Sequence, residues 1–189
     1  MKKTITILLT ILLAVGLLVS CQSEGIQETE SFESEAVSEP NAHETVNDGF
    51  GSAGAFESIN PTIEEMLVYA IQDEYAARAE YEYLINDLGA GNPFVNIMKA
   101  EETHIAMLLP LFETYGYEVP EDTSSDHLIE VSSITEALEA GVLAEINNIA
   151  MYEMFLEQDL PSDIMAAFTS LRDASMKHQD AFQRKLDRS

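Results

Sequence analysis

The chain has 189 residues, of which 46% are hydrophobic and 23% are charged, a composition that excludes a wholly disordered protein. Its 34 acidic and 9 basic residues give a formal net charge of −25. Because such a surface repels phosphate groups, we expect no nucleic-acid partner. The single cysteine excludes an intrachain disulfide and any zinc or redox motif built from cysteine pairs.

The N-terminus has the features of a secretion signal. Two lysines precede an apolar run at positions 5–19, which has the length of a signal-peptide core and is short for a membrane span. The run ends in Leu-Val-Ser-Cys, which resembles the bacterial lipobox, in which the cysteine becomes the lipidated first residue of the mature protein. We therefore predict that residues 1–20 are a lipoprotein signal peptide and that Cys21 is diacylated, which anchors the protein stably to membrane lipid. An ordinary signal peptide with an incidental cysteine is the alternative.

A lipidated Cys21 would place the mature protein outside the cytoplasm, on the outer face of the cell membrane, or on the outer membrane if the cell has two. Residues 22–60 contain 9 acidic residues, neither lysine nor arginine, and no apolar periodicity. Such a segment buries too little apolar surface to offset its conformational entropy. We therefore predict that residues 21–60 form a lipid-anchored, acidic, disordered tether.

Residues 61–189 carry apolar residues every three or four positions, which is typical of amphipathic helices. The pattern predicts four helices, the first two of which run from Thr62 to near Gly89 and from Asn92 to Gly116. The third begins at Ser133, and the fourth follows a break at residues 159–162. Thr62 and Ser133 are each followed by glutamate three residues later, which is the spacing of a capping box, and Asn92-Pro93 is typical of an N-cap followed by proline at the first helical position.

The connections between these helices predict their order in space. Helices one and two, and helices three and four, are joined by short turns, whereas the polar segment 117–132 is long enough to run the length of a bundle. The fold class is therefore all-α, a four-helix bundle with one long crossover between helices two and three.

Each predicted helix carries polar residues near the middle of its apolar stripe. The first and third helices place one glutamate there, and the second and fourth place a residue and a histidine three positions apart, on one helix face. Tyrosine follows the first-helix and third-helix glutamates at the same offset of seven residues. These residues are Glu74, Tyr81, Glu101, His104, Glu145, Tyr152, Ser175 and His178.

This pattern resembles the ferritin-like superfamily of di-metal carboxylate proteins, and more narrowly the group named domain of unknown function 2202, over residues 61–188. The resemblance implies a ferritin-like bundle and five metal ligands: Glu74, Glu101, His104, Glu145 and His178. Ser175 departs from the pattern, because the superfamily has a second bridging glutamate there, which leaves open one ion or two. Tyr81 and Tyr152 are expected to be core aromatics whose hydroxyl groups bond to a carboxylate; the alternative is that they orient ligands or pass electrons.

The donor set favours a metal independently of the resemblance. Three ionised carboxylates in a bundle core each cost several kcal/mol without a cation. Oxygen-rich ligands with imidazole suit iron, manganese or zinc, and we expect one or two ions of iron or manganese. A metal-free glutamate–histidine network that fixes the helix register is the alternative.

Two interpretations of function follow. The first is an extracytoplasmic metal-binding protein with redox or ferroxidase-type activity, which makes a metal-dependent oxidoreductase one option. The second is a non-enzymatic helical module that binds a protein or polymer of the cell envelope. We expect a monomer or small homo-oligomer rather than a storage cage, because the chain is tethered and strongly acidic.

Overall fold

The computed structural model describes residues 49–189, which form five α-helices, one short 3-10 helix and no strand. The helices are α1 (Gly51–Glu57), α2 (Ile63–Asp87), α3 (Phe94–Tyr115), η1 (Ser124–His127), α4 (Ile134–Leu156) and α5 (Ser162–Leu186). The prediction of an all-α protein is therefore confirmed for the described residues. The predicted signal peptide, Cys21 and most of the predicted tether lie outside them.

Two predicted helix starts are formed by side chains at the expected positions. The Thr62 hydroxyl accepts a hydrogen bond from the Glu65 N–H (3.2 Å), and the Glu65 carboxylate accepts one from the Thr62 N–H (2.7 Å), so this capping box is complete. Ser133 likewise accepts a bond from the Glu136 N–H (3.2 Å). The Glu136 carboxylate instead accepts a bond from the N–H of Ser132 (2.8 Å), so the second box is half formed.

The start of α3 differs from its prediction. Asn92 was expected to be the N-cap, with Pro93 inside the helix, but α3 begins at Phe94 and Pro93 is itself the N-cap residue. The far end agrees with the sequence, since Gly116 ends α3 in the left-handed conformation (φ 70°). A residue with a side chain would be strained there, and glycine is not.

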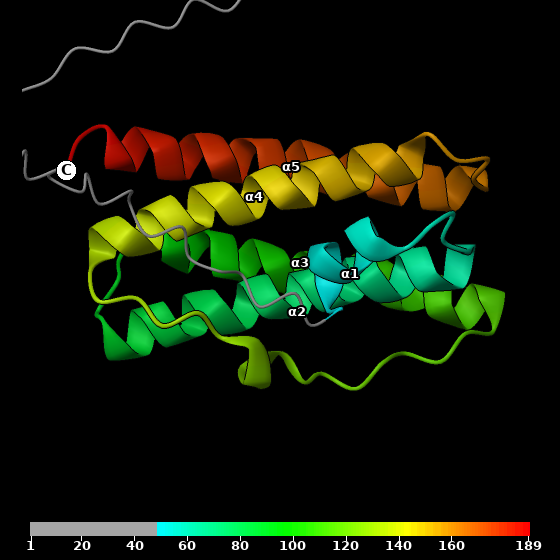
Figure 1. The fold of residues 1–189 in the computed structure, drawn as a ribbon, viewed down its shortest axis with the longest axis horizontal. Coiled ribbons are helices and arrows are strands. Elements are labelled where there is room, and N and C mark those ends of the chain that lie inside the picture. Colours follow the sequence, from blue (N-terminus) through cyan, green and yellow to red (C-terminus); the bar gives the residue numbers. More distant parts are fainter. Residues whose placement is uncertain (1–48) are drawn as a thin grey trace, which may run out of the picture. The chain divides into compact units, whose positions relative to one another are not determined.

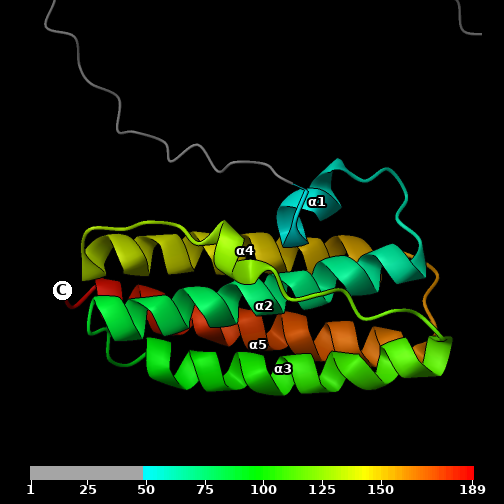
Figure 2. The same ribbon diagram turned by 90° about the horizontal axis from the view of Figure 1, so that it is seen from below.

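The four long helices α2, α3, α4 and α5 lie side by side (Figures 1 and 2), with α2 packed on α3 and α4 packed on α5. The connection from α3 to α4 follows the length of these helices from one end to the other (Figure 1). It is held to α2 by an ion pair between Arg78 and Asp122 and by the Ile129 N–H, which donates to Glu80 (3.0 Å). None of the helices in residues 49–189 is long and apolar enough to cross a membrane.

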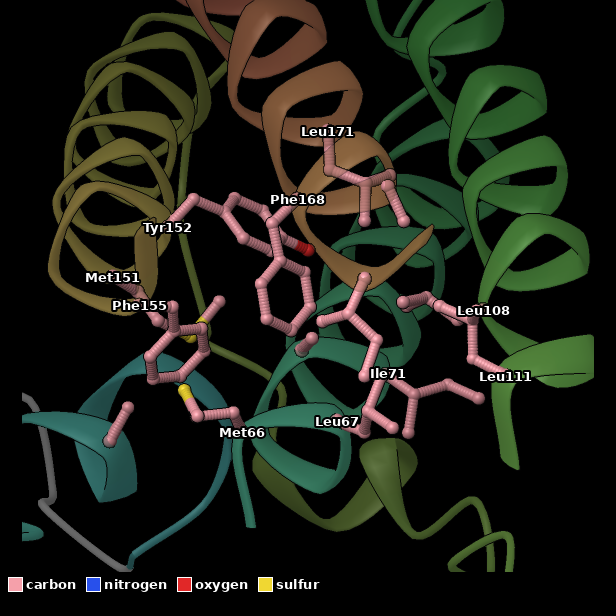
Figure 3. Close-up of a cluster of buried hydrophobic side chains, with 14 of the residues drawn as sticks. Met66, Leu67, Ile71, Leu108, Leu111, Met151, Tyr152, Phe155, Phe168 and Leu171 are labelled. Atoms are coloured by element: carbon pink, nitrogen blue, oxygen red, sulfur yellow. The ribbon is translucent and has the colours of Figure 1, made fainter. Parts of the chain in front are cut away.

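The apolar interior consists of two clusters, with the predicted polar residues between them along every long helix. One cluster joins the first half of α2, the second halves of α3 and α4, and the first half of α5 (Figure 3). The other joins the opposite halves and contains the rings of Tyr81, Phe94 and Phe182, with centroids 5.1–5.9 Å apart. The members of the first cluster that Figure 3 labels are Met66, Leu67, Ile71, Leu108, Leu111, Met151, Tyr152, Phe155, Phe168 and Leu171.

The N-terminal boundary of the folded part differs from the prediction. The sequence predicts a disordered tether up to residue 60, but residues 51–57 form α1, which packs against α2 and α4 and buries Ala55 completely. The Ser52 N–H donates to the Asp73 carboxylate (2.8 Å), and the Gly51 N–H donates to the Gln72 side chain (3.2 Å). This contact uses small residues and backbone groups, and it therefore left no apolar stripe for the sequence to show.

Gly54→Ala is expected to displace α1. A Cβ at Gly54 would meet the backbone oxygen of Gly49 at 2.1 Å, and such overpacking costs about 1–3 kcal/mol. Limited proteolysis should cut the variant between residues 49 and 61, where the wild type resists. Gly91→Ala is the matched control, because a Cβ there meets nothing within 4 Å. Equal resistance of both variants would contradict the docking of α1.

Candidate metal centre

The structure brings together the five side chains that were predicted to bind metal. Glu74 comes from α2, Glu101 and His104 from α3, Glu145 from α4 and His178 from α5. The three carboxylates and His104 are buried, with at most 7% of each residue exposed, and the His178 side chain is 11% exposed. Their positions follow from the helical phase, since each residue interrupts an apolar stripe that faces the interior.

Glu101 lies at the centre of this group and contacts both histidines. Its Oε2 atom lies 2.6 Å from Nδ1 of His104, and its Oε1 atom lies 3.1 Å from Nδ1 of His178. The same nitrogen of His104 lies 3.0 Å from Oε2 of Glu74, and that of His178 lies 3.4 Å from Oε1 of Glu145. The two imidazole rings stack with centroids 5.5 Å apart. One carboxylate therefore joins two Glu–His pairs.

This geometry defines two overlapping groups of three ligands. Within residues 49–189, Glu74, Glu101 and His104 each offer a ligand atom within 4.8 Å of the others, and so do Glu101, Glu145 and His178. Although Nδ1 of His178 is buried and close to two carboxylates, it forms no hydrogen bond of good geometry with any described residue. A buried nitrogen without a hydrogen bond is costly, and coordination of a cation would use its lone pair.

Two buried tyrosines bind Glu74 and Glu145, which we call the outer glutamates because they lie on either side of Glu101. The Tyr152 hydroxyl, on α4, donates to Oε1 of Glu74 on α2 (2.6 Å). The Tyr81 hydroxyl, on α2, donates to Oε1 of Glu145 on α4 (3.1 Å). Each tyrosine therefore fixes the carboxylate of the opposite helix, and the predicted ligand-orienting role is consistent with both contacts.

Ser175 is buried, but its hydroxyl faces a different partner from the one that the superfamily pattern implies. It donates to Oδ1 of Asn148 (2.9 Å), and the backbone oxygen of Leu171 lies 3.1 Å away. The Asn148 amide donates in turn to the carboxylate of Asp73. A hydrogen-bonded chain thus connects α5, α4 and α2, and the Ser52 N–H extends it to α1.

Asp73 and Asn148 are two residues beside the centre that were not predicted from the sequence. Asp73 precedes Glu74, and Asn148 lies three residues after Glu145, on the same helix face. The spacing of Asn148 was therefore a visible signal. Nothing in the spacing identified Asp73, because one of its two partners is a backbone N–H group of α1.

Burial and neighbouring charge raise the pKa of both outer glutamates. Burial, followed by the negative charge of Glu101, raises the pKa of Glu74 to about 8. Burial raises the pKa of Glu145 to about 7, against the lowering effect of His178. Without a cation, both carboxyl groups therefore retain protons well above the ordinary range for glutamate.

The pKa values of Glu101 and the two histidines are shifted in the directions that favour their charged forms. Burial alone would raise the pKa of Glu101, but the close contacts of its carboxylate with His104 and His178 outweigh it and lower the pKa to about 2. Burial would lower the histidine pKa values, but their carboxylate neighbours raise the pKa of His104 to about 10 and that of His178 to about 9. The metal-free centre therefore balances its charge with protons.

A small cavity borders one side of the centre, between α2 and α4. Its volume is about 20 Å³, which is enough for one water molecule. Side chains of Glu101, Glu145 and Tyr81 line it, as do those of Asp73 and Asn148. It therefore lies beside the second group of ligands and beside the hydrogen-bonded chain from Ser175.

Comparison with known proteins gives the family of the chain. The profile of an uncharacterized protein domain family, DUF2202, matches residues 63–189, and the chain belongs to this family. No curated protein matches the sequence. The chain is similar to the crystal structure of hypothetical protein MJ0754 from Methanococcus jannaschii DSM 2661, with 25% identity and a TM-score of 0.62 over 70% of this chain and 83% of that one.

The shifted pKa values predict how the stability of the metal-free protein depends on pH. The folded-state pKa values of Glu74 (about 8) and Glu145 (about 7) lie above the ordinary 4.5, and those of His104 (about 10) and His178 (about 9) lie above 6.5. The contributions of these four groups to the stability of the folded state are complete at pH values below their unfolded-state pKa values. They are lost as the pH rises through the folded-state pKa values.

The melting temperature of the metal-free protein should therefore be higher at pH 5 than at pH 8.5. Below pH 4.5 it should fall again, because the low pKa of Glu101 stabilises the folded state only while that group is ionised. Glu74→Gln should flatten the slope between pH 5 and 8.5, since it removes one titrating group. A melting temperature that rises across this range would contradict the proton-balanced centre.

Proposed function

We propose that the domain is a ferritin-like metal-binding protein that holds one or two ions of iron or manganese outside the cytoplasm. The observation that carries this proposal is the position of Glu101, which offers one carboxylate oxygen to each of two Glu–His pairs. A polar network that only fixes the helix register does not need two Glu–His pairs around one carboxylate. A carboxylate that bridges two sets of metal ligands requires this arrangement.

The path of the chain supports the ferritin-like part of the proposal. Two helix pairs, α2 with α3 and α4 with α5, are joined by a long connection that follows the helices (Figure 1). A carboxylate from the first helix of each pair and a histidine from the second face one centre, which is the arrangement of ligands in ferritin-like carboxylate proteins.

The donor chemistry fits a divalent cation. Glu74, Glu101 and Glu145 supply oxygens, His104 and His178 supply nitrogens, and Nδ1 of His178 is a buried atom that lacks a hydrogen bond among the described residues. Glutamate with histidine suits iron, manganese or zinc. A bound iron or manganese ion would supply one-electron redox chemistry, on which the proposed ferroxidase-type or other oxidoreductase activity rests.

The rest of the centre positions the ligands and shields them from water along the helix axes. Tyr81 and Tyr152 hold the outer glutamates in fixed orientations through their hydroxyl groups. The two apolar clusters cover the centre along the helix axes. The low dielectric of this interior strengthens each contact between an ionised ligand and a cation.

A metal-free module of the cell envelope is the second candidate function. The observation that favours it is the set of contacts that the centre makes without a cation, since His104 lies within hydrogen-bonding distance of both Glu74 and Glu101. In that case the buried network would fix the helix register. Anchorage through lipid on Cys21, in a monomer or small homo-oligomer, belongs to both candidates and remains a proposal.

Glu101→Gln should lower metal affinity strongly. The substitution keeps the shape of the side chain, removes its charge and replaces one of its two carboxylate oxygens with an amide nitrogen. Because even residues that only orient ligands contribute about 10–100-fold, the loss should be at least that large. The measurement is titration of ferrous or manganous ions into the purified protein, with elemental analysis.

Glu102→Gln is the matched control, since Glu102 is the exposed neighbour on the same helix. It changes the net charge by the same amount and should leave affinity unchanged. If Glu101→Gln binds metal as tightly as Glu102→Gln, the proposal is wrong and the structural network remains.

Ser175→Glu should strengthen the binding of a second metal ion. Ser175 and His178 have the same spacing as Glu101 and His104, so a glutamate at 175 restores the position that the superfamily pattern fills with a carboxylate. The number of tightly bound ions per chain should rise, or the weaker ion should bind more tightly. Ser175→Gln is the control of equal size and should not have this effect. Two tight ions already present in the wild type would show that the serine costs no affinity.

A further inference from the structure

The helix α1 rests on α2 at the residue that precedes a proposed metal ligand. The Ser52 N–H of α1 donates to Oδ1 of Asp73 (2.8 Å), and the next residue of α2 is Glu74. The contact is close, because a Cβ on Gly51 would lie 2.7 Å from the same Oδ1 atom and 3.2 Å from Cα of Asp73. Docking of α1 therefore holds both the side chain and the backbone of Asp73 in place.

Asp73 also connects α1 to two other helices that carry proposed ligands. Its Oδ2 atom accepts a hydrogen bond from the Asn148 amide on α4, and the amide oxygen of Asn148 accepts one from Ser175 on α5 (2.9 Å). Each residue of this chain lies beside a proposed ligand or about one helical turn from one. The ligands concerned are Glu74 for Asp73, Glu145 for Asn148 and His178 for Ser175. Three of the four helices that carry ligands are therefore joined to α1.

We propose that docking of α1 and binding of metal at the centre stabilise each other, with Asp73 as the positioning residue that couples them. The inference rests on the proposed function and adds its regulation, because the segment between Cys21 and α1 would then act on metal affinity. Asp73 is not itself a ligand in this account, since it belongs to neither group of three among the described residues.

The first reason for the coupling is that docked α1 holds the ligands in position. Residues that only orient metal ligands contribute about 10–100-fold to metal affinity. With α1 docked, Asp73 accepts a bond at each carboxylate oxygen, and Asn148 is bonded at both ends of its amide group. Undocking removes the donor at Oδ1 of Asp73, so both side chains gain freedom of movement beside Glu74 and Glu145.

The second reason is electrostatic. The side chains of Asp73, Glu101 and Glu145 line the same small cavity between α2 and α4. Negative charge on Glu101 therefore repels negative charge on Asp73 in the metal-free protein, whereas a cation at the centre attracts both. The cation thus favours a charged Asp73 in its present position, where it is a strong acceptor for the Ser52 N–H.

The test measures how manganous ions change the opening of α1 in the full chain. Chymotrypsin cleaves after phenylalanine, and Phe56 is an exposed side chain of α1. When opening and closing are fast, the rate of cleavage follows the population of undocked α1. Saturating manganese should slow cleavage after Phe56 about 5-fold or more, which is the lower end of coupling between sites.

Asp73→Ala should abolish this effect of manganese on the cleavage rate. Gln72→Ala is the matched control, because Gln72 also accepts a hydrogen bond from an α1 N–H, that of Gly51, but does not belong to the chain that ends at Ser175. Its cleavage should be faster than that of the wild type and should still be slowed by manganese. Asp73→Asn is a second variant of equal size, in case Asp73→Ala does not fold.

A second measurement follows because coupling between two sites is reciprocal. Gly54→Ala, which is expected to displace α1, should bind manganese more weakly than the wild type. The factor should match the one by which manganese slows cleavage of the wild type, and Gly91→Ala should bind manganese as the wild type does.

Three results would overturn the inference alone. These are an unchanged cleavage rate in the manganese-loaded wild type, equal slowing by manganese in the Asp73 variants, and wild-type metal affinity in a Gly54→Ala protein whose α1 is cleaved rapidly. Failure of the wild type to take up either manganous or ferrous ions, measured by elemental analysis, would overturn the proposed function and this inference with it.

Discussion

A carboxylate buried between two imidazoles is the interaction on which the rest of the structure depends. Glu101 can remain ionised in the interior only because His104 and His178 approach it from two helices. This requirement fixes the rotation of α3, which supplies Glu101 and His104, and the position of α5 beside it. The outer glutamates then approach the same histidines from α2 and α4, so one charge sets the register of all four long helices.

The polar centre around Glu101 divides the apolar interior, and burying its carboxyl groups costs free energy. The apolar residues form two clusters with the polar centre between them, rather than one continuous core. Glu74 and Glu145 are held in low-dielectric surroundings where their charged forms are disfavoured. A cation would relieve that cost and displace their protons, so binding of a metal would stabilise the fold and depend on pH.

The sequence predicted the long helices and the centre because both depend on helical period. Glu74, Glu101, His104, Glu145 and His178 interrupt apolar stripes at matched depths, and the structure places them together. Helical period carries no information about α1, which docks through glycine, alanine and backbone N–H groups. Helical period also did not identify the partner of Ser175, because a small hydroxyl group can bond to any neighbour. In the structure this hydroxyl donates to the side chain of Asn148 on α4.

The most direct test of the account is a crystal structure of the iron- or manganese-loaded protein, with diffraction data collected on both sides of the absorption edge of the metal. The account predicts an anomalous peak at about 2 Å from Nδ1 of His104 or His178 and from a carboxylate oxygen of Glu101. A second peak would complete a dinuclear centre. Well-ordered Glu101, His104 and His178 side chains in their present contacts, with no anomalous peak among them after loading, would contradict the metal centre.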